Sequence, residues 1–203
     1  MMLDNLDPDL RTSVIGFISG LLGVFFVFIK KIVGNLGDRL ITKRDAVVET
    51  LSVGKLIKDC LTNLLVDWDA GRACIVQFHN GGSFFTGGSM QKFSITHEEI
   101  APGVNPMHKV LQNIIITNAS WIGDVLDGTF VVPSVKKLQD VTTRTFFEEF
   151  GVESVIGIPL KKDNKVVGIL MLQFILKQPK LDDECLTQLA EQCKNIPALL
   201  LHC

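Results

Sequence analysis

The sequence predicts an α+β domain built around an antiparallel sheet. An apolar segment, a polar turn and a returning apolar segment over residues 154–176 predict a β-hairpin. A second alternating segment lies at residues 92–98, and amphipathic helical patterns stand at residues 53–67 and from residue 182 onward. Strands enclosed by helices, rather than alternating with them, favour antiparallel pairing.

The composition is that of a folded protein and excludes several classes. The 203 residues are 47% hydrophobic and 21% charged, unlike a disordered polymer. Lys plus Arg number 20 against 22 Asp plus Glu, so no nucleic-acid partner bound through a broad basic surface is expected. The five cysteines lack paired close spacing, which excludes a disulfide scaffold and a structural zinc site and favours a reducing compartment.

The amino-terminal region predicts a membrane anchor. Residues 13–29 contain no charged side chain, and a helix of this length spans about 25 Å of a bilayer. A cleaved signal peptide and a buried core helix are the alternatives, but three Asp precede the segment, where a signal peptide needs positive charge. The predicted organisation is a tail over 1–12, a transmembrane helix over 13–33, a juxtamembrane stalk helix over 34–52 and a domain over 53–203.

Positive charges around the predicted span set its orientation. One Arg precedes the segment, whereas five basic residues follow it: Lys30, Lys31, Arg39, Lys43 and Arg44. The positive-inside rule then places the amino terminus outside and the domain in the cytoplasm, at the inner (plasma) membrane. The unpaired cysteines agree with a cytoplasmic domain.

Small residues in the span and apolar residues in the stalk predict a homodimer. Glycines four residues apart allow two membrane helices to approach closely, although glycine is also common in such helices for other reasons. The apolar stripe of the stalk does not continue into the stripe of the next helix, so a partner is needed to cover it. The predicted dimer contacts are Gly16, Ser19, Gly20, Gly23, Val48 and Leu51.

The first half of the domain is predicted to contain one helix and two strands. The helix over 53–67 has an apolar stripe that begins at Val53 and includes Leu56. Residues 72–79 form a nearly continuous apolar strand, which indicates burial on both faces. Residues 80–88 are expected to form a glycine-rich loop before the strand at 92–98.

The second half is irregular before its hairpin. Residues 110–116 are apolar and of undecided type, and residues 145–150 are expected to form a short helix capped by Gly151. Asp163 and Asn164 suit the tight turn of the predicted hairpin. The last helix begins near residue 182, with a buried stripe of Leu186, Leu189, Ala190, Cys193, Ile196 and Leu200.

These carboxyl-terminal segments resemble a GAF domain. The matching positions are Ser154, Pro159, Leu160, Val167, Gly168, Leu170 and Leu172, followed by an acid-started helix. The resemblance covers residues 46–200, strongly over the last fifty and weakly over 80–150. It implies a six-stranded antiparallel sheet with terminal helices on one face. It also implies a small-molecule pocket on the other face, walled by residues 80–150.

Candidate ligand-binding residues are the polar and aromatic side chains of that stretch: His79, Asn80, Ser94, Thr96, Glu98, Trp121, Asp124 and Phe130. The alternative is that the aromatic side chains fill the space as ordinary core. No metal site is expected, because His79 and His97 lie about 20 Å apart if their strands pair. The ligand and any cofactor are unknown.

No catalytic constellation stands out, so an enzyme is not expected. GAF-fold enzymes that use pocket cysteines would need a thiol within residues 80–150, and none occurs there. The leading hypothesis is a membrane-anchored sensor or small-ligand-binding module that signals through dimerisation or a partner. The alternative is a structural or assembly membrane protein that uses its GAF-like fold as an interaction surface.

Overall fold

The computed structural model describes residues 25, 29–31, 46–175, 177, 179 and 182–201. The chain forms two compact units, Met1–Glu49 and Thr50–Cys203, and the sheet belongs to the second. The predicted span over 13–33 and the dimer residues Gly16, Ser19, Gly20 and Gly23 fall outside the described residues, except for 25 and 29–31. Within the described part of the chain, none of the helices combines the length and hydropathy that a bilayer crossing requires.

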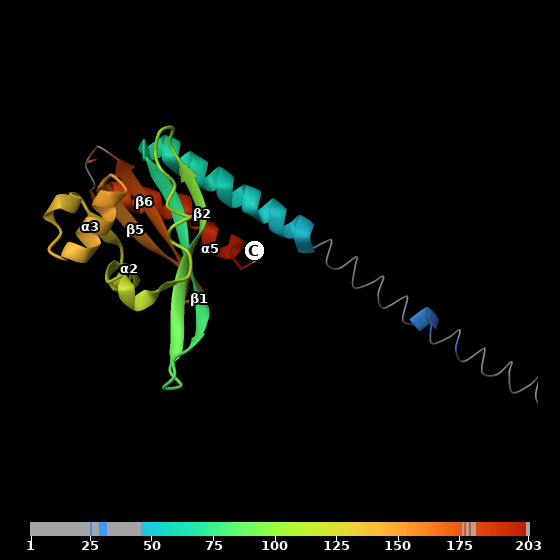
Figure 1. Cartoon of the computed structure of the whole chain (residues 1–203). Helices are drawn as coiled ribbons and strands as arrows, with labels where there is room; N and C mark the ends of the chain where they lie inside the picture. Colours follow the sequence, from blue (N-terminus) through green and yellow to red (C-terminus); the bar gives the residue numbers. More distant parts are fainter. Residues whose placement is uncertain are drawn as a thin grey trace, which may run out of the picture. The chain divides into compact units, whose positions relative to one another are not determined.

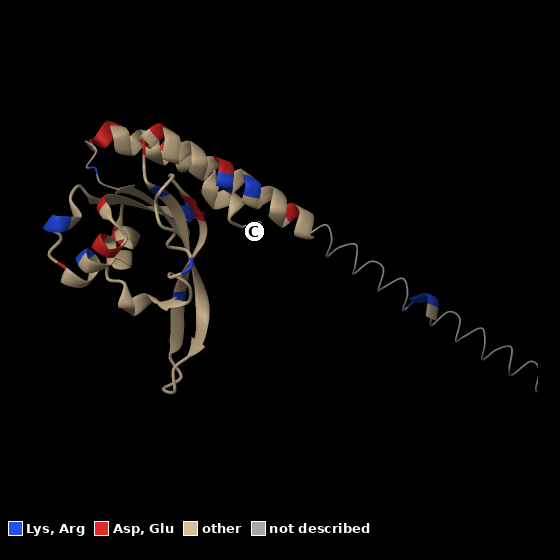
Figure 2. Cartoon of the chain, turned by 45° about the horizontal axis from the view of Figure 1, so that its top comes forward, with Lys and Arg blue, Asp and Glu red and all other residues tan. Residues whose placement is uncertain are grey.

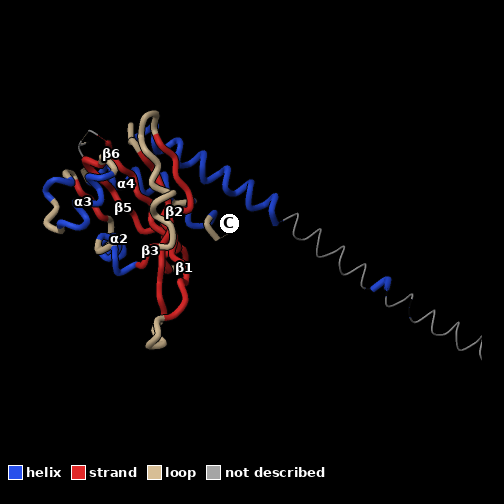
Figure 3. Tube along the Cα trace, viewed as in Figure 1, coloured by secondary structure: helices blue, strands red, loops and turns tan. Residues whose placement is uncertain are grey.

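A six-stranded antiparallel sheet forms the centre of the second unit (Figure 1, Figure 3). The strands lie in the order β3-β2-β1-β6-β5-β4, which confirms the predicted sheet. Their bounds are Arg72–Ser83 for β1, Ser89–Ile100 for β2, Ile114–Ile115 for β3, Phe130–Val132 for β4, Val152–Lys162 for β5 and Lys165–Ile175 for β6.

Helices cover both faces of the sheet. An N-terminal helix over residues 46–68, α4 (Asp183–Cys193) and α5 (Ile196–Leu199) cover one face. The other face carries α2 (Trp121–Asp127), α3 (Val141–Glu149) and the 3-10 turns Ile116–Asn118 and Val135–Lys137. Burial on both faces explains the uninterrupted apolar start of β1.

Two separate cores result from the alternation of side chains along the strands. On the face of the N-terminal helix, the core contains Val53, Ile57, Leu61, Leu64, Ala73, Ile75, Ile156, Leu170, Leu172, Leu189, Cys193, Ile196 and Leu200, among others. On the opposite face it contains Cys74, Val76, Phe93, Ile95, Met107, Leu111, Trp121, Ile122, Val125, Phe147, Val155, Ile169 and Met171, among others.

Local signals in the sequence fix several element boundaries. Asp163 and Asn164 adopt φ of 49° and 60°, which is the left-handed geometry that the β5–β6 turn requires. The Asp182 side chain accepts a hydrogen bond from the Cys185 amide at the start of α4. Gly151, with φ of 68°, follows the end of α3. The hairpin, the start of the last helix and the glycine cap are therefore confirmed, although the last helix is divided into α4 and α5.

Two expectations for the local structure are wrong. The segment 80–88 is not all loop, because β1 continues to Ser83 by pairing with β2. Leu56 and Ala190 point to solvent, since neighbouring positions on their helices fill the core instead. The N-terminal helix runs without interruption through residues 52–54, and its buried stripe begins at Val53.

Candidate functional site: an apolar cavity beside α2 and α3

A small apolar cavity lies on the sheet face that carries α2 and α3. Its volume is about 140 Å³, and it is partly open to solvent. β2 and the loop before β3 provide one wall, and the starts of α2 and α3 provide the others. The lining residues are Phe93, Leu111, Ile114, Asn118, Ala119, Trp121, Thr142, Thr143 and Phe146.

The aromatic side chains around the cavity hold each other in place. Trp121 is 3% exposed, and its ring meets the Phe93 ring edge-on, with centroids 5.9 Å apart. Trp121 also packs against Phe147, with ring centroids 6.3 Å apart. Phe147 packs in turn against Phe146, with ring centroids 5.2 Å apart. These rings form one packed row, so a ligand in the cavity would contact a wall that is already ordered.

A carboxylate clamp joins the two helices of the cavity wall. Asp140 accepts hydrogen bonds from the Ser120 hydroxyl, from Thr143 Oγ1 at 2.6 Å and from the Thr142 amide at 3.0 Å. The hydrogen bond from Ser120, followed by the one from Thr143, holds the pKa of Asp140 below its ordinary value. Ser120 directly precedes α2 and Thr143 lies in α3, so the clamp fixes their separation.

One polar group stands at the opening of the cavity. Asn118 is exposed, and its side chain makes no hydrogen bond within the residues that the structure describes. An amide offers both a donor and an acceptor to a ligand. A largely apolar cavity with a few placed polar groups, here Asn118, Thr142 and Thr143, is a typical arrangement for binding a small molecule.

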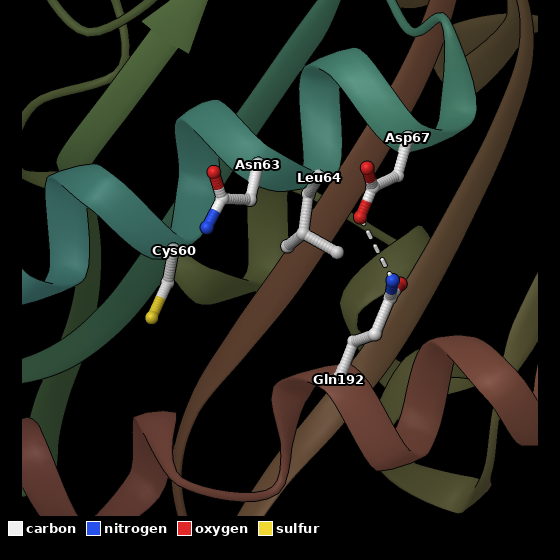
Figure 4. A pocket seen from close by; sticks show the side chains of 5 residues that line it. All are labelled: Cys60, Asn63, Leu64, Asp67 and Gln192. Carbon is white, nitrogen blue, oxygen red and sulfur yellow. Dashed lines mark hydrogen bonds between the residues drawn. The ribbon is translucent and has the colours of Figure 1, made fainter.

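Two other hollows are less suited to an apolar ligand. A cavity of about 190 Å³ lies between the N-terminal helix and α4, lined by Cys60, Asn63, Leu64, Asp67 and Gln192 (Figure 4). Its polar groups bond each other, since Gln192 Nε2 donates to Asp67 at 3.0 Å. A wider and shallower hollow of about 330 Å³ runs along residues 131–138.

Two of the predicted ligand-binding residues hold a loop in place beside the cavity. Ser94 Oγ accepts a hydrogen bond from the Asn113 amide at 2.9 Å and lies 3.0 Å from His79 Nε2. The Glu98 carboxylate accepts the amides of Met107 at 2.8 Å and His108 at 3.1 Å. The loop between β2 and β3 is therefore fastened along β2, which presents Leu111 and Ile114 to the cavity.

Glu98 also pairs with a fully buried arginine. Arg72 Nε lies 3.3 Å from a Glu98 oxygen, with side-chain exposures of 0% and 3%. Further Arg72 contacts are hydrogen bonds to the Gln173 side chain and the Asn105 carbonyl, and the ring of Phe150 at 5.8 Å. Burial lowers the pKa of Arg72, and the nearby Glu98 opposes that shift. With these partners, Glu98 is engaged as a structural residue.

The remaining predicted site residues lie elsewhere. Asn80 accepts a hydrogen bond from the Gly82 amide at 3.0 Å in the hairpin, and Thr96 donates to Gln77 at 2.7 Å. Asp124 is exposed on α2, because Trp121, Ile122 and Val125 form the inward face of that helix. Phe130 on β4 packs against the core beside the cavity. Of the predicted ligand-binding residues, only Trp121 lines the cavity.

Most of the lining residues lie outside the predicted site. The sequence predicts Phe93 only as a strand residue, and it gives Asn118, Ala119, Thr142 and Thr143 no role. A signal was present at Asp140, an acid before a helical segment, which is typical of a helix start. That signal locates the start of α3, but the contact between α3 and α2 depends on residues twenty positions apart.

The described residues show neither an activated thiol nor a clustered metal site. Burial raises the pKa of the Cys74 and Cys193 thiols to about 12, so both are protonated at neutral pH. No three His, Cys, Asp or Glu among the described residues are placed to hold a metal ion.

The fold is similar to that of several solved GAF domains. The chain matches the GAF domain region of a Geobacter sulfurreducens PCA protein with a TM-score of 0.61 at 14% identity, covering 77% of this chain and 98% of that one. The PixJ GAF domain of Thermosynechococcus elongatus matches with a TM-score of 0.59 at 12% identity, covering 75% and 86%. A far-red cyanobacteriochrome photoreceptor matches with a TM-score of 0.57 at 13% identity, covering 85% and 94%.

These matches establish a GAF-like fold, and at such identities they establish the fold alone. No protein-family model matches the chain, and no curated protein is similar to it in sequence. The resemblance read from the carboxyl-terminal segments is confirmed at the level of the fold.

Replacing Glu98 tests the buried ion pair. Glu98→Leu leaves the Arg72 charge buried without its partner, which is expected to cost about 3–5 kcal/mol of unfolding free energy. The double variant Arg72→Met, Glu98→Leu removes both charges and should be more stable than the Glu98→Leu single variant. Glu99→Leu is the control, because its ion pair with Lys58 is at the surface, and should change stability by less than about 1 kcal/mol. Urea unfolding measures these three variants, the Arg72→Met single variant and wild type; a double variant as unstable as the sum of its singles contradicts the pairing.

Acidification tests the carboxylate clamp at Asp140. Its pKa is lowered in the folded protein, so its stabilisation is present above the ordinary carboxyl pKa and lost as the pH falls through the folded value. Asp140→Asn should therefore melt below wild type at pH 7, and the gap should shrink once the pH falls below about 4. The control Asp127→Asn, at the exposed end of α2, should melt close to wild type over this whole pH range. A gap for Asp140→Asn that is constant with pH would contradict the clamp.

Proposed function

We propose that the chain is a membrane-anchored sensor module that binds a small apolar ligand, about one aromatic ring in size, in the cavity beside α2 and α3. The observation that carries the proposal is the cavity itself, apolar and lined by Phe93, Trp121 and Phe146. The GAF-like fold supports it, because the resemblance implies a pocket on this face of the sheet. The uncharged segment over residues 13–29 supports the anchor.

The volume of the cavity selects the class of ligand. An engineered apolar cavity of about 150 Å³ in another protein stays dry and binds benzene or xenon. A cavity of about 140 Å³ therefore accepts one ring, whereas drug-sized ligands occupy about 300–1,000 Å³. Asn118 at the opening favours a ring with one hydroxyl or carbonyl substituent, such as a phenol.

Ligand binding would reach the N-terminal helix through the sheet. Phe93 lines the cavity from β2, and β2 pairs with β1 from one end of the strand to the other. Ile75 of β1 packs in the same core as Ile57 and Leu61 of the N-terminal helix, on the opposite face. A ligand in the cavity thus contacts β2, and β1, the partner strand of β2, packs against the N-terminal helix on the opposite face of the sheet.

Filling the cavity with a larger side chain tests whether the ligand binds there. Ala119→Leu places an isobutyl group in the cavity, so it should abolish ligand binding while the fold is retained. Phenol is the probe: it should raise the melting temperature of wild type progressively as its concentration increases above the dissociation constant and leave that of Ala119→Leu unchanged. The control Ala198→Leu makes the same change at an exposed site on α5 and should respond like wild type. Equal responses of wild type and Ala119→Leu to phenol would exclude this cavity as the site.

We further propose that two copies pair through the span and the stalk helix. Val48 and Leu51 are 57% and 69% exposed on the N-terminal helix. A stalk that pairs with a second copy requires such exposed apolar side chains. Gly16, Ser19, Gly20 and Gly23 supply a small-residue stripe for the membrane segments. This pairing also serves the alternative function, an assembly protein, in which the cavity would remain empty.

Crosslinking in native membranes tests the pairing. Val48→Cys and Leu51→Cys, each in a background without the native cysteines, should crosslink efficiently, and Gly20→Ile should reduce both crosslinks. Thr50→Cys is the control, because a helix rotates 100° per residue and turns this position away from the other two. A chain that is absent from the membrane fraction, or crosslinks equally at all three positions, contradicts the proposal.

A further inference from the structure

The β1–β2 hairpin extends beyond the rest of the sheet. β6 pairs with β1 only as far as Val76, whereas β1 and β2 remain paired as far as Ser83 and Ser89. Figures 1 and 3 show the end of this two-stranded ribbon projecting past the other strands. At ~3.3 Å per residue, the ribbon reaches about 23 Å past its last contact with β6.

Two phenylalanines stand at the tip of this hairpin. Phe85 is fully exposed and Phe84 is 45% exposed. Hydrogen bonds of 2.8 Å from the Phe84 amide to the Gly88 carbonyl and from the Gly87 amide to the Phe84 carbonyl close the loop. Gly87 adopts φ of 83°, which only glycine enters without strain. The two rings are therefore presented on a defined turn.

The hairpin tip carries no charge. Between Arg72 and Lys92 the sequence contains no Asp, Glu, Lys or Arg. Figure 2 shows the projecting end of the ribbon without a basic or acidic residue. An exposed pair of large apolar side chains with no nearby charge is unusual on a protein surface that faces water, and it indicates a binding surface.

The small size of the tip favours lipid over a protein partner. Two phenylalanines can bury about 300–500 Å² together, whereas each side of a specific protein interface buries about 800 Å². A bilayer needs no surface of matching shape, and aromatic side chains are favourable where its headgroups meet its acyl chains.

We propose that Phe84 and Phe85 insert into the bilayer to which residues 13–29 are predicted to anchor the chain. The inference extends the proposed function and rests on its anchor, but not on the ligand cavity. Residues 30–49 join the segment to the domain and span at most about 70 Å when extended. Because this tether keeps the domain close to the membrane, a weak insertion is sufficient. The hairpin then gives the domain a second membrane contact that fixes its orientation.

Lipid-dependent fluorescence quenching tests the insertion. Full-length Phe85→Trp protein is reconstituted into vesicles of phosphatidylcholine, either plain or with brominated acyl chains. The matched control is Lys162→Trp, at the exposed end of the β5–β6 hairpin, and wild type supplies the signal of Trp68 and Trp121. The tryptophan fluorescence added by Phe85→Trp should shift to shorter wavelength in vesicles and should lose more than half its intensity in brominated lipid. The fluorescence added by Lys162→Trp should not change.

Each of the other results overturns the inference. Equal quenching of both variants means that the domain lies on the bilayer without a specific role for the hairpin. No quenching of either variant means that the tip stays in water or occupies a protein partner. A chain that does not float with the vesicles lacks the anchor itself, whereas phenol binding at the cavity would be unaffected by any of these results.

Discussion

The buried pair of Arg72 and Glu98 is the interaction on which the cavity side of the domain depends. Arg72 opens β1 between β2 and β6, and its guanidinium is fully removed from water. A charge in this position is tolerated only with close partners, which Glu98, Gln173 and the Asn105 carbonyl provide. Glu98 in turn accepts the Met107 and His108 amides, so the carboxylate that pairs with the buried charge also fixes the course of the loop after β2.

This loop and a row of aromatic rings connect the ion pair to the cavity. The loop leads from Glu98 to Leu111 and Ile114, which line the cavity. The rings run from Phe150, which packs on Arg72, through Phe146 and Phe147 to Trp121 and Phe93. The cavity is thus enclosed by residues whose positions are set from both sides, and this explains how a small void persists in a core that otherwise packs closely.

Local patterns predicted the fold better than they predicted the site. The β5–β6 hairpin follows from Asp163 and Asn164, and the last helix from its acidic start, because the physical cause in each case lies within a few residues. Glu98 looked like a ligand-binding carboxylate, since its partner Arg72 is distant in sequence and its burial is a tertiary property. The extension of β1 through Gly81 and Gly82 was missed because cross-strand pairing overrode the turn preference of those glycines. The cavity itself arises where β2, α2 and α3 meet, and no single segment encodes it.

The central claim is that the cavity beside α2 and α3 accepts an apolar guest of ring size. Diffraction from a crystal of the protein under xenon pressure tests it most directly, because xenon binds apolar cavities without any specific chemistry. We expect an anomalous peak bordered by Phe93, Ala119 and Trp121 that is absent from crystals of the Ala119→Leu variant. Xenon at other sites, with none between these three residues, would contradict the claim that the cavity is a binding site.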